Sequence, residues 1–119
     1  MIIHVKNKNT LIIDDFVFKC CIGKKGFNSN KIEGDNSTPK GLFKLKKLYY
    51  RKDRIKSFKC RIKKKIITKN LAWCDNPNHK YYNEEIKDFS NKNREKFYRK
   101  DNKYDFLITI NHNQKKTPY

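Results

Sequence analysis

The stretch Lys31–Phe43 restricts the backbone more than any other part of this sequence, because it holds two glycines and a proline among short polar residues. Gly34 and Gly41 can adopt backbone conformations that other residues rarely reach. Pro39 fixes its own φ and pushes the residue before it towards an extended conformation. The side chains of residues 35–37 (Asp-Asn-Ser) bond readily to nearby backbone and favour turns over helix. The pattern predicts an ordered turn that leads into an extended segment.

The order Glu-Gly-Asp-x-x-Thr-Pro-x-Gly-x-Phe over residues 33–43 resembles an L,D-transpeptidase catalytic domain of the YkuD type. In that family a Thr-Pro-x-Gly-x-Phe segment follows the opening strands. Three further stretches fit the same subfamily, in the same order: Cys21–Gly26, Trp73–Pro77 and Tyr104–Asn113. The resemblance therefore covers nearly the whole chain. It implies a mainly β fold, a mixed sheet or sandwich, with one or two short helices.

The resemblance also implies which residues belong to the substrate groove or its motifs. Trp73 and Asp75 are placed by it near the groove that leads to the active site. His112 follows the clearest strand and could reach a substrate, although the sequence shows no partner that would make it a general base. Glu33 and Asp35 stand two residues apart in a glycine-containing turn, and their carboxylates are expected to cap backbone N–H groups. The full set is Glu33, Gly34, Asp35, Thr38, Pro39, Gly41, Phe43, Trp73, Asp75 and His112.

The implied reaction is acyl transfer between peptidoglycan stem peptides in the cell envelope or periplasm, without a metal or organic cofactor. A cysteine attacks a peptide bond, forms a thioester and passes the acyl group to an amine. In the family, the catalytic His and the Gly-Cys motif come after the segment that corresponds to Thr117–Tyr119. We therefore expect the 119 residues to form the N-terminal part of one such domain, inactive alone. The chain could instead be a non-catalytic relative that binds the cell envelope, and the sequence does not distinguish this alternative from the first one.

The charge of the chain suggests a different class of function. Thirty Lys and Arg against twelve Asp and Glu give a formal net charge of +18. Such a charge attracts nucleic acid, and Tyr49, Tyr50 and Phe58 could stack on bases in a small RNA-binding module. The basic residues are spread almost evenly, however, which favours a solvated basic surface and only non-specific binding. No run approaches the ~18 apolar residues of a membrane span, and no signal peptide is visible, so without a leader the chain would be cytoplasmic.

Most of the chain shows strand patterns, and its 119 residues suffice for one domain. Ile2–Val5, Leu11–Ile13 and Phe16–Ile22 predict an antiparallel meander. Phe58–Ile62 alternates apolar and basic residues and predicts a half-buried strand. Tyr104–Ile110 is rich in β-branched and aromatic residues and predicts a central strand. Tyr81–Tyr98 is the one region with a broken helical stripe, which predicts two short helices or irregular turns.

The four cysteines do not show the spacing of a zinc site, in which paired cysteines stand two to four residues apart. Cys20 and Cys21 are adjacent, and Cys60 and Cys74 stand alone. A disulfide is possible if the protein is exported, with the pairing left open. Cys74 lies close in sequence to His79, but it ends an apolar segment, so we expect a buried structural cysteine rather than a nucleophile.

Overall fold

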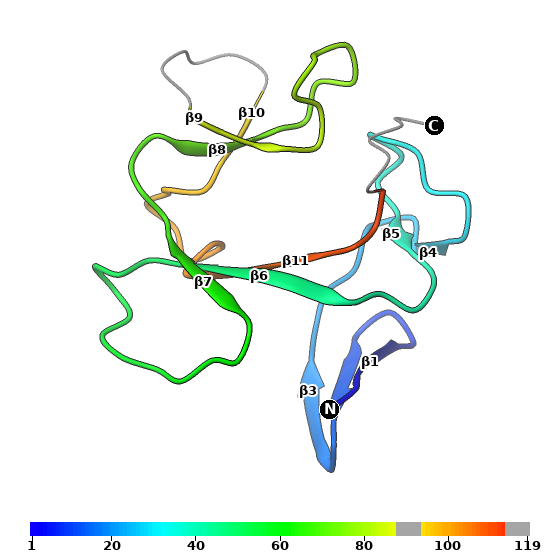
Figure 1. The fold of residues 1–119 in the computed structure, drawn as a ribbon. Helices are drawn as coiled ribbons and strands as arrows, with labels where there is room; N and C mark the ends of the chain where they lie inside the picture. Colours follow the sequence, from blue (N-terminus) through cyan, green and yellow to red (C-terminus); the bar gives the residue numbers. More distant parts are fainter. Residues whose placement is uncertain (88–93, 114–119) are drawn as a thin grey trace. The chain divides into compact units, whose positions relative to one another are not determined.

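The computed structural model describes residues 1–87 and 94–113 and shows β-strands joined by turns and loops (Figure 1). The described residues contain no helix, and so none that could cross a membrane. The chain divides into two compact units, the first spanning Met1–Gly41 and the second beginning at Leu42.

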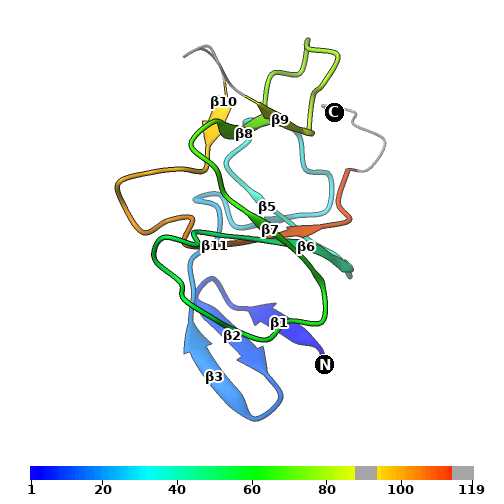
Figure 2. The same cartoon turned by 60° about the vertical axis from the view of Figure 1, so that its left-hand side comes forward.

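The first unit opens with the predicted antiparallel meander. Strands β1 (Ile3–Lys6), β2 (Thr10–Ile13) and β3 (Phe16–Lys19) lie in the order β1-β2-β3 (Figure 2). The turns between them pass through Asn7 and Asp14, whose φ values are 55° and 50°. β3 is shorter than the predicted Phe16–Ile22, because the last residue of β2 to pair with it is Thr10, opposite Lys19.

The second unit contains a three-stranded sheet in which β6 (Leu45–Tyr50) is central. β11 (Phe106–Ile110) pairs with it antiparallel on one side, and β7 (Lys63–Ile66) pairs with it parallel on the other. A second sheet has β8 (Leu71–Cys74) between β9 (Glu85–Lys87) and β10 (Arg94–Lys96).

Three predictions about this unit are wrong. Residues 85–87 and 94–96 are strands rather than the predicted short helices or irregular turns, because both pair with β8. Residues 81–84 of the same region do form a turn and a bend, and residues 88–93 lie outside the described residues. The predicted strand Phe58–Ile62 forms no strand, because Phe58 turns inward onto Tyr50 and Phe106, and the pairing with β6 begins only at Lys63. β11 lies at the edge of its sheet, since β6 takes the centre.

The hydrophobic core of this unit is built around Tyr49, Ile67, Leu71 and Phe97, each at most 4% exposed. The Phe97 ring contacts the rings of Tyr49, Trp73 and Tyr104 at centroid distances of 5.3–6.3 Å. Aromatic contacts of this kind add to the free energy of burial. Two rings that the sequence offered for base stacking, Tyr49 and Phe58, are thus taken up by packing inside the protein.

Two arginines after β6 hold the loop that precedes β11. Arg51 is 3% exposed, forms a two-pronged ion pair with Asp53, donates to the carbonyl of Arg99 and lies over the Tyr98 ring at 3.6 Å. Arg54 donates to Asp105 and to the carbonyls of residues 99–101. The planar guanidinium group is suited to such multiple contacts. These two cations therefore organise the fold.

Candidate functional site

The motif turn of the first unit is held by hydrogen bonds in its backbone and side chains. β4 (Phe27–Asn28) and β5 (Thr38–Pro39) pair in parallel, and the N–H groups of Thr38 and Lys40 donate to the carbonyls of Gly26 and Asn28. The Thr38 hydroxyl accepts the N–H of Gly23 at 2.8 Å. A Cβ at Gly23 would lie 2.5 Å from the carbonyl oxygen of Asn36. Thr38 thus has a structural role in the turn, which is as ordered as the sequence predicted.

Asp35 is the hub of this turn. Its carboxylate accepts the backbone N–H groups of Ile32 and Ser37, at 3.0 and 2.9 Å, and it also accepts the Ser37 hydroxyl and the Lys31 ammonium. The hydrogen bond from Lys31, followed by those from Ile32 and Ser37, holds the pKa of Asp35 well below its usual value. The predicted capping role is confirmed for Asp35, and for Glu33 it stays a prediction.

Positive φ angles complete the turn. They occur at Gly34 (77°), Asn36 (56°) and Gly41 (155°). Non-glycine residues are uncommon in this region of backbone space, and asparagine is among those that tolerate it. The two glycines singled out in the sequence therefore sit where the backbone needs them.

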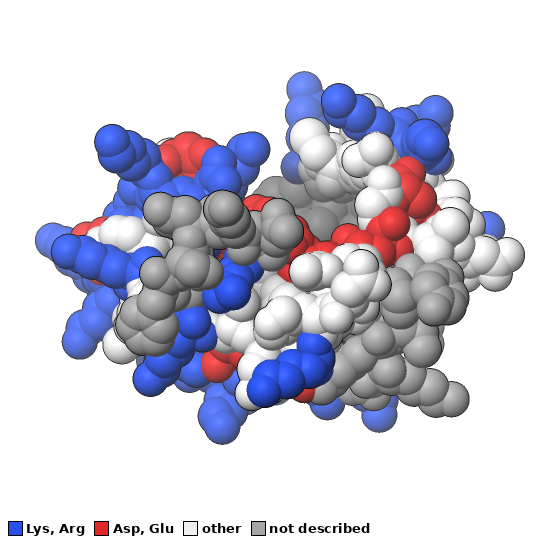
Figure 3. All heavy atoms as spheres, turned by 90° about the horizontal axis from the view of Figure 1, so that it is seen from above, with Lys and Arg blue, Asp and Glu red and all other residues white. Residues whose placement is uncertain are grey.

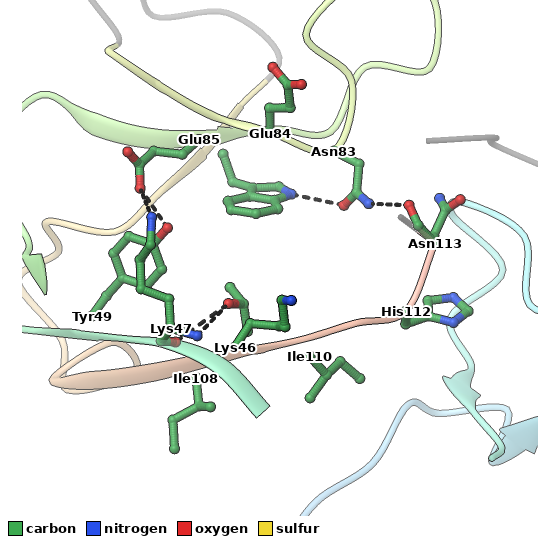
Figure 4. A pocket seen from close by; sticks show the side chains of 12 residues that line it. Lys46, Lys47, Tyr49, Asn83, Glu84, Glu85, Ile108, Ile110, His112 and Asn113 are labelled. Atoms are coloured by element: carbon green, nitrogen blue, oxygen red, sulfur yellow. Dashed lines mark hydrogen bonds and ion pairs between the residues drawn. The ribbon is translucent and has the colours of Figure 1, made fainter. Parts of the chain in front are cut away.

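An open groove of about 710 Å³ lies within the second unit (Figure 4). Its lining comes from β6, the β8–β9 region, β11 and the residues that follow β11: Lys46, Lys47, Tyr49, Trp73, Asn83, Glu84, Glu85, Ile108, Thr109, Ile110, His112 and Asn113. Apolar, aromatic, amide and charged groups together line one concave surface, as is usual for ligand sites.

One end of the groove is closed by an ionic cluster around Glu85. This carboxylate accepts the Tyr49 hydroxyl at 2.5 Å, bonds the Lys65 ammonium, and has the Lys47 ammonium 3.7 Å away. Burial acts to raise the pKa of Glu85, but the hydrogen bonds from Lys65 and Tyr49 outweigh it, so the pKa is lowered. The cluster joins β9 to β6 and β7, and so links the two sheets of the unit.

The opposite wall is held by Asn83. Its Oδ1 accepts the indole N–H of Trp73 at 3.1 Å, and its Nδ2 donates to the carbonyl of Asn113 at 3.0 Å (Figure 4). Asn83 adopts a φ of 57°, and its own N–H donates to the carbonyl of Cys74. One side-chain amide therefore fixes Trp73 relative to the segment that follows β11.

Of the predicted site residues in this unit, two line the groove and one supports it. Trp73 and His112 are among the lining residues. Phe43 packs against the imidazole of His112, edge to face, with ring centroids 5.5 Å apart. Asp75 is exposed and does not line the groove. The structure thus brings together Phe43, Trp73 and His112.

The two cysteines of the second unit, Cys60 and Cys74, are not among the residues that line the groove. Cys74 is 2% exposed, which confirms the predicted burial, and all four cysteines are free thiols. His79 accepts the N–H of Tyr81 through its Nδ1 and is exposed. Among residues 1–87 and 94–113, no group of three or more His, Cys, Asp or Glu side chains could hold a metal ion.

Sequence reasoning missed most of the groove residues. Lys46, Lys47, Asn83, Glu85 and Ile108 carry no motif of their own. The adjacent residues Asn83, Glu84 and Glu85 were a possible signal, but they fell in a segment predicted as helical. Lysines are so evenly distributed along the sequence that no pair stands out; the space-filling view shows Lys and Arg side chains in several separate parts of the visible face (Figure 3).

In a comparison with known families, the model of the L,D-transpeptidase catalytic domain, YkuD, matches residues 2–116. Comparisons with curated proteins and with solved structures found no match. The family match spans nearly the whole chain and includes the motif turn, the groove and the cysteines described above. This chain therefore belongs to the YkuD family of L,D-transpeptidase catalytic domains.

Proposed function

We propose that the chain takes part in peptidoglycan cross-linking by L,D-transpeptidation, and that the groove of the second unit binds a stem peptide. The observation that carries the proposal is the groove itself, in a chain that belongs to this family. Its lining includes Trp73 and His112, two of the residues expected at the substrate site. Ligand sites commonly combine aromatic and polar groups on one concave surface in this way.

We further propose that none of the four cysteines is the nucleophile. A reactive thiolate needs exposure and a neighbouring base or positive field. Cys74 is buried in β8, and Cys60 does not line the groove of its unit. Cys20 and Cys21 belong to the first unit and not to the unit that holds the groove. The role that we propose for these 119 residues is therefore substrate binding.

Acylation by a carbapenem, the β-lactam class that the family resemblance implies as a ligand, tests whether any of the four cysteines is the nucleophile. The chain is incubated with the carbapenem, and intact mass and peptide mapping locate any adduct. We expect no adduct on Cys20, Cys21, Cys60 or Cys74. An adduct on any of these four cysteines would overturn the proposed roles.

Binding of stem peptides tests the groove separately. Trp73 is the single tryptophan of the chain and lines the groove, so its fluorescence reports on ligands there. We expect a saturable change with a muropeptide stem and none with an unrelated peptide of equal length and charge. The variant Trp73→Phe removes the signal, and calorimetry then measures the remaining affinity.

A further inference from the structure

The pairing of β6 with β11 contains an irregularity beside the groove. Ile108 pairs with Leu48, but Ile110 pairs with Leu45, so two residues of β6, Lys46 and Lys47, stand opposite Thr109 alone. This is a β-bulge, a local insertion that bends a strand and changes the direction of a side chain. Bulges of this kind are common beside functional sites.

The hydroxyl of Thr109 holds the bulge. It accepts the N–H of Lys47 at 3.2 Å and lies 3.4 Å from the Lys47 carbonyl, to which it donates. In a regular strand, successive side chains point to opposite faces, so one of two consecutive lysines would face away. Here both Lys46 and Lys47 line the groove.

The two lysines differ in their partners. The Lys47 ammonium lies 3.7 Å from Glu85 and 5.4 Å from the centre of the Tyr49 ring. Lys46 is exposed, and within the described part of the chain its ammonium has no ion pair or hydrogen bond. Its side chain extends from β6 into the space that faces Asn83 (Figure 4).

The geometry points to Lys46 as the residue that binds the C-terminal carboxylate of the peptide in this groove. The bulge in β6 directs the Lys46 side chain into the groove. This inference rests on the proposed function and adds a specificity determinant to it. A lysine ammonium forms charge-assisted hydrogen bonds with a carboxylate, which are stronger than neutral ones.

The test compares two probes, a stem tetrapeptide with a free C-terminal carboxylate and the same peptide with a C-terminal amide. Affinities come from Trp73 fluorescence, in the 119-residue chain. We expect the wild type to prefer the free acid by roughly tenfold, the size of effect that one charge-assisted hydrogen bond supports. Lys46→Met is expected to lose this preference, and Lys46→Arg to keep most of it.

Lys69→Met is the matched control, because Lys69 is also exposed and does not line the groove, and because its substitution makes the same change in net charge. It should keep the preference. Thr109→Val retains both lysines but removes the hydroxyl that holds the bulge, and it should reduce the preference with no change in charge. Circular dichroism checks that each variant folds, and Lys46→Gln replaces Lys46→Met if that variant fails.

The outcomes separate the two proposals. If the wild type binds acid and amide equally, or if Lys46→Met retains the preference, Lys46 is not the carboxylate site, while the groove remains a peptide site. If neither peptide binds the wild type, the proposed function and this inference both fail. Loss of the preference in Lys69→Met as well would show a general effect of charge and would also overturn the assignment.

Discussion

The Tyr49 hydroxyl donates a 2.5 Å hydrogen bond to Oε2 of Glu85, and this contact joins the central strand of one sheet to an edge strand of the other. Tyr49 is 2% exposed and packs on Phe97, so its ring belongs to the core while its hydroxyl reaches the groove. A single residue therefore connects the stability of this unit to the shape of the candidate site.

The contribution of this contact can be measured by two substitutions at one position. Tyr49→Phe removes the hydrogen bond and keeps the ring, so we expect a loss of about 0.5–1.5 kcal/mol in the free energy of unfolding. Tyr49→Ala also removes the buried ring, and the loss should reach about 3–5 kcal/mol. Denaturant titration with Trp73 fluorescence measures both, and Tyr81→Phe, at a tyrosine that is 44% exposed, is the control. Equal losses for the two substitutions at Tyr49 would contradict this separation of roles.

The lowered pKa of Glu85 predicts a loss of stability in acid. A carboxylate whose pKa is lower in the folded state stabilises the protein above its unfolded pKa of about 4.5, and this stabilisation disappears as the pH falls. We expect the free energy of unfolding of the second unit to decrease below about pH 4.5, and Glu85→Gln to flatten that dependence while lowering stability at pH 7. Denaturant midpoints between pH 3 and 7 give the measurement. A variant with the slope of the wild type would show that other carboxylates are responsible.

Thr38 belongs to the sequence motif that identifies the family, yet its observed contact is structural. Thr38→Val keeps the shape of the side chain and leaves the N–H of Gly23 without its acceptor, so we expect a loss of about 1–3 kcal/mol. Thr38→Ser keeps the hydroxyl and should lose much less. Thermal or denaturant unfolding of the first unit measures the stability of the two variants, and amide hydrogen exchange at Gly23 then shows whether its N–H is still hydrogen-bonded in each. Slow exchange at Gly23 in Thr38→Val would show that another group accepts this N–H.

The sequence predicted the parts of the fold that depend on local chemistry. The turn at residues 31–43 could be predicted because glycine, proline and short polar residues each restrict or permit specific backbone angles, and the observed angles at Gly34 and Asn36 follow from that. The meander β1–β3 could be predicted because its strands are close in sequence and separated by polar turns.

The parts that the sequence did not predict depend on distant partners. Lys63–Lys65 has the composition of an exposed turn, but it pairs in parallel with β6, and parallel pairing brings together residues that no local pattern relates. β9 and β10 are short and polar, and only their pairing with β8 makes them strands. The bulge at Lys46 and Lys47 arises from the register between β6 and β11, two strands that are separated in the sequence by about half the chain.

The expectation for nucleic acid remains non-specific binding. Four side chains that a specific RNA site would have used are engaged elsewhere: Tyr49 in the core, Phe58 against Tyr50 and Phe106, and Arg51 and Arg54 on the loop before β11. The remaining basic residues are dispersed along the sequence. We expect weak binding to oligonucleotides at low salt, equal for different sequences, with an affinity that falls steeply as salt rises. Fluorescence anisotropy at about 0.02 and 0.15 M salt, where the Debye length shortens to about 8 Å, measures it. Tight, sequence-dependent binding at the higher salt, reduced by Tyr50→Ala but unchanged by Tyr81→Ala, would instead assign the chain a nucleic-acid site that includes Tyr50.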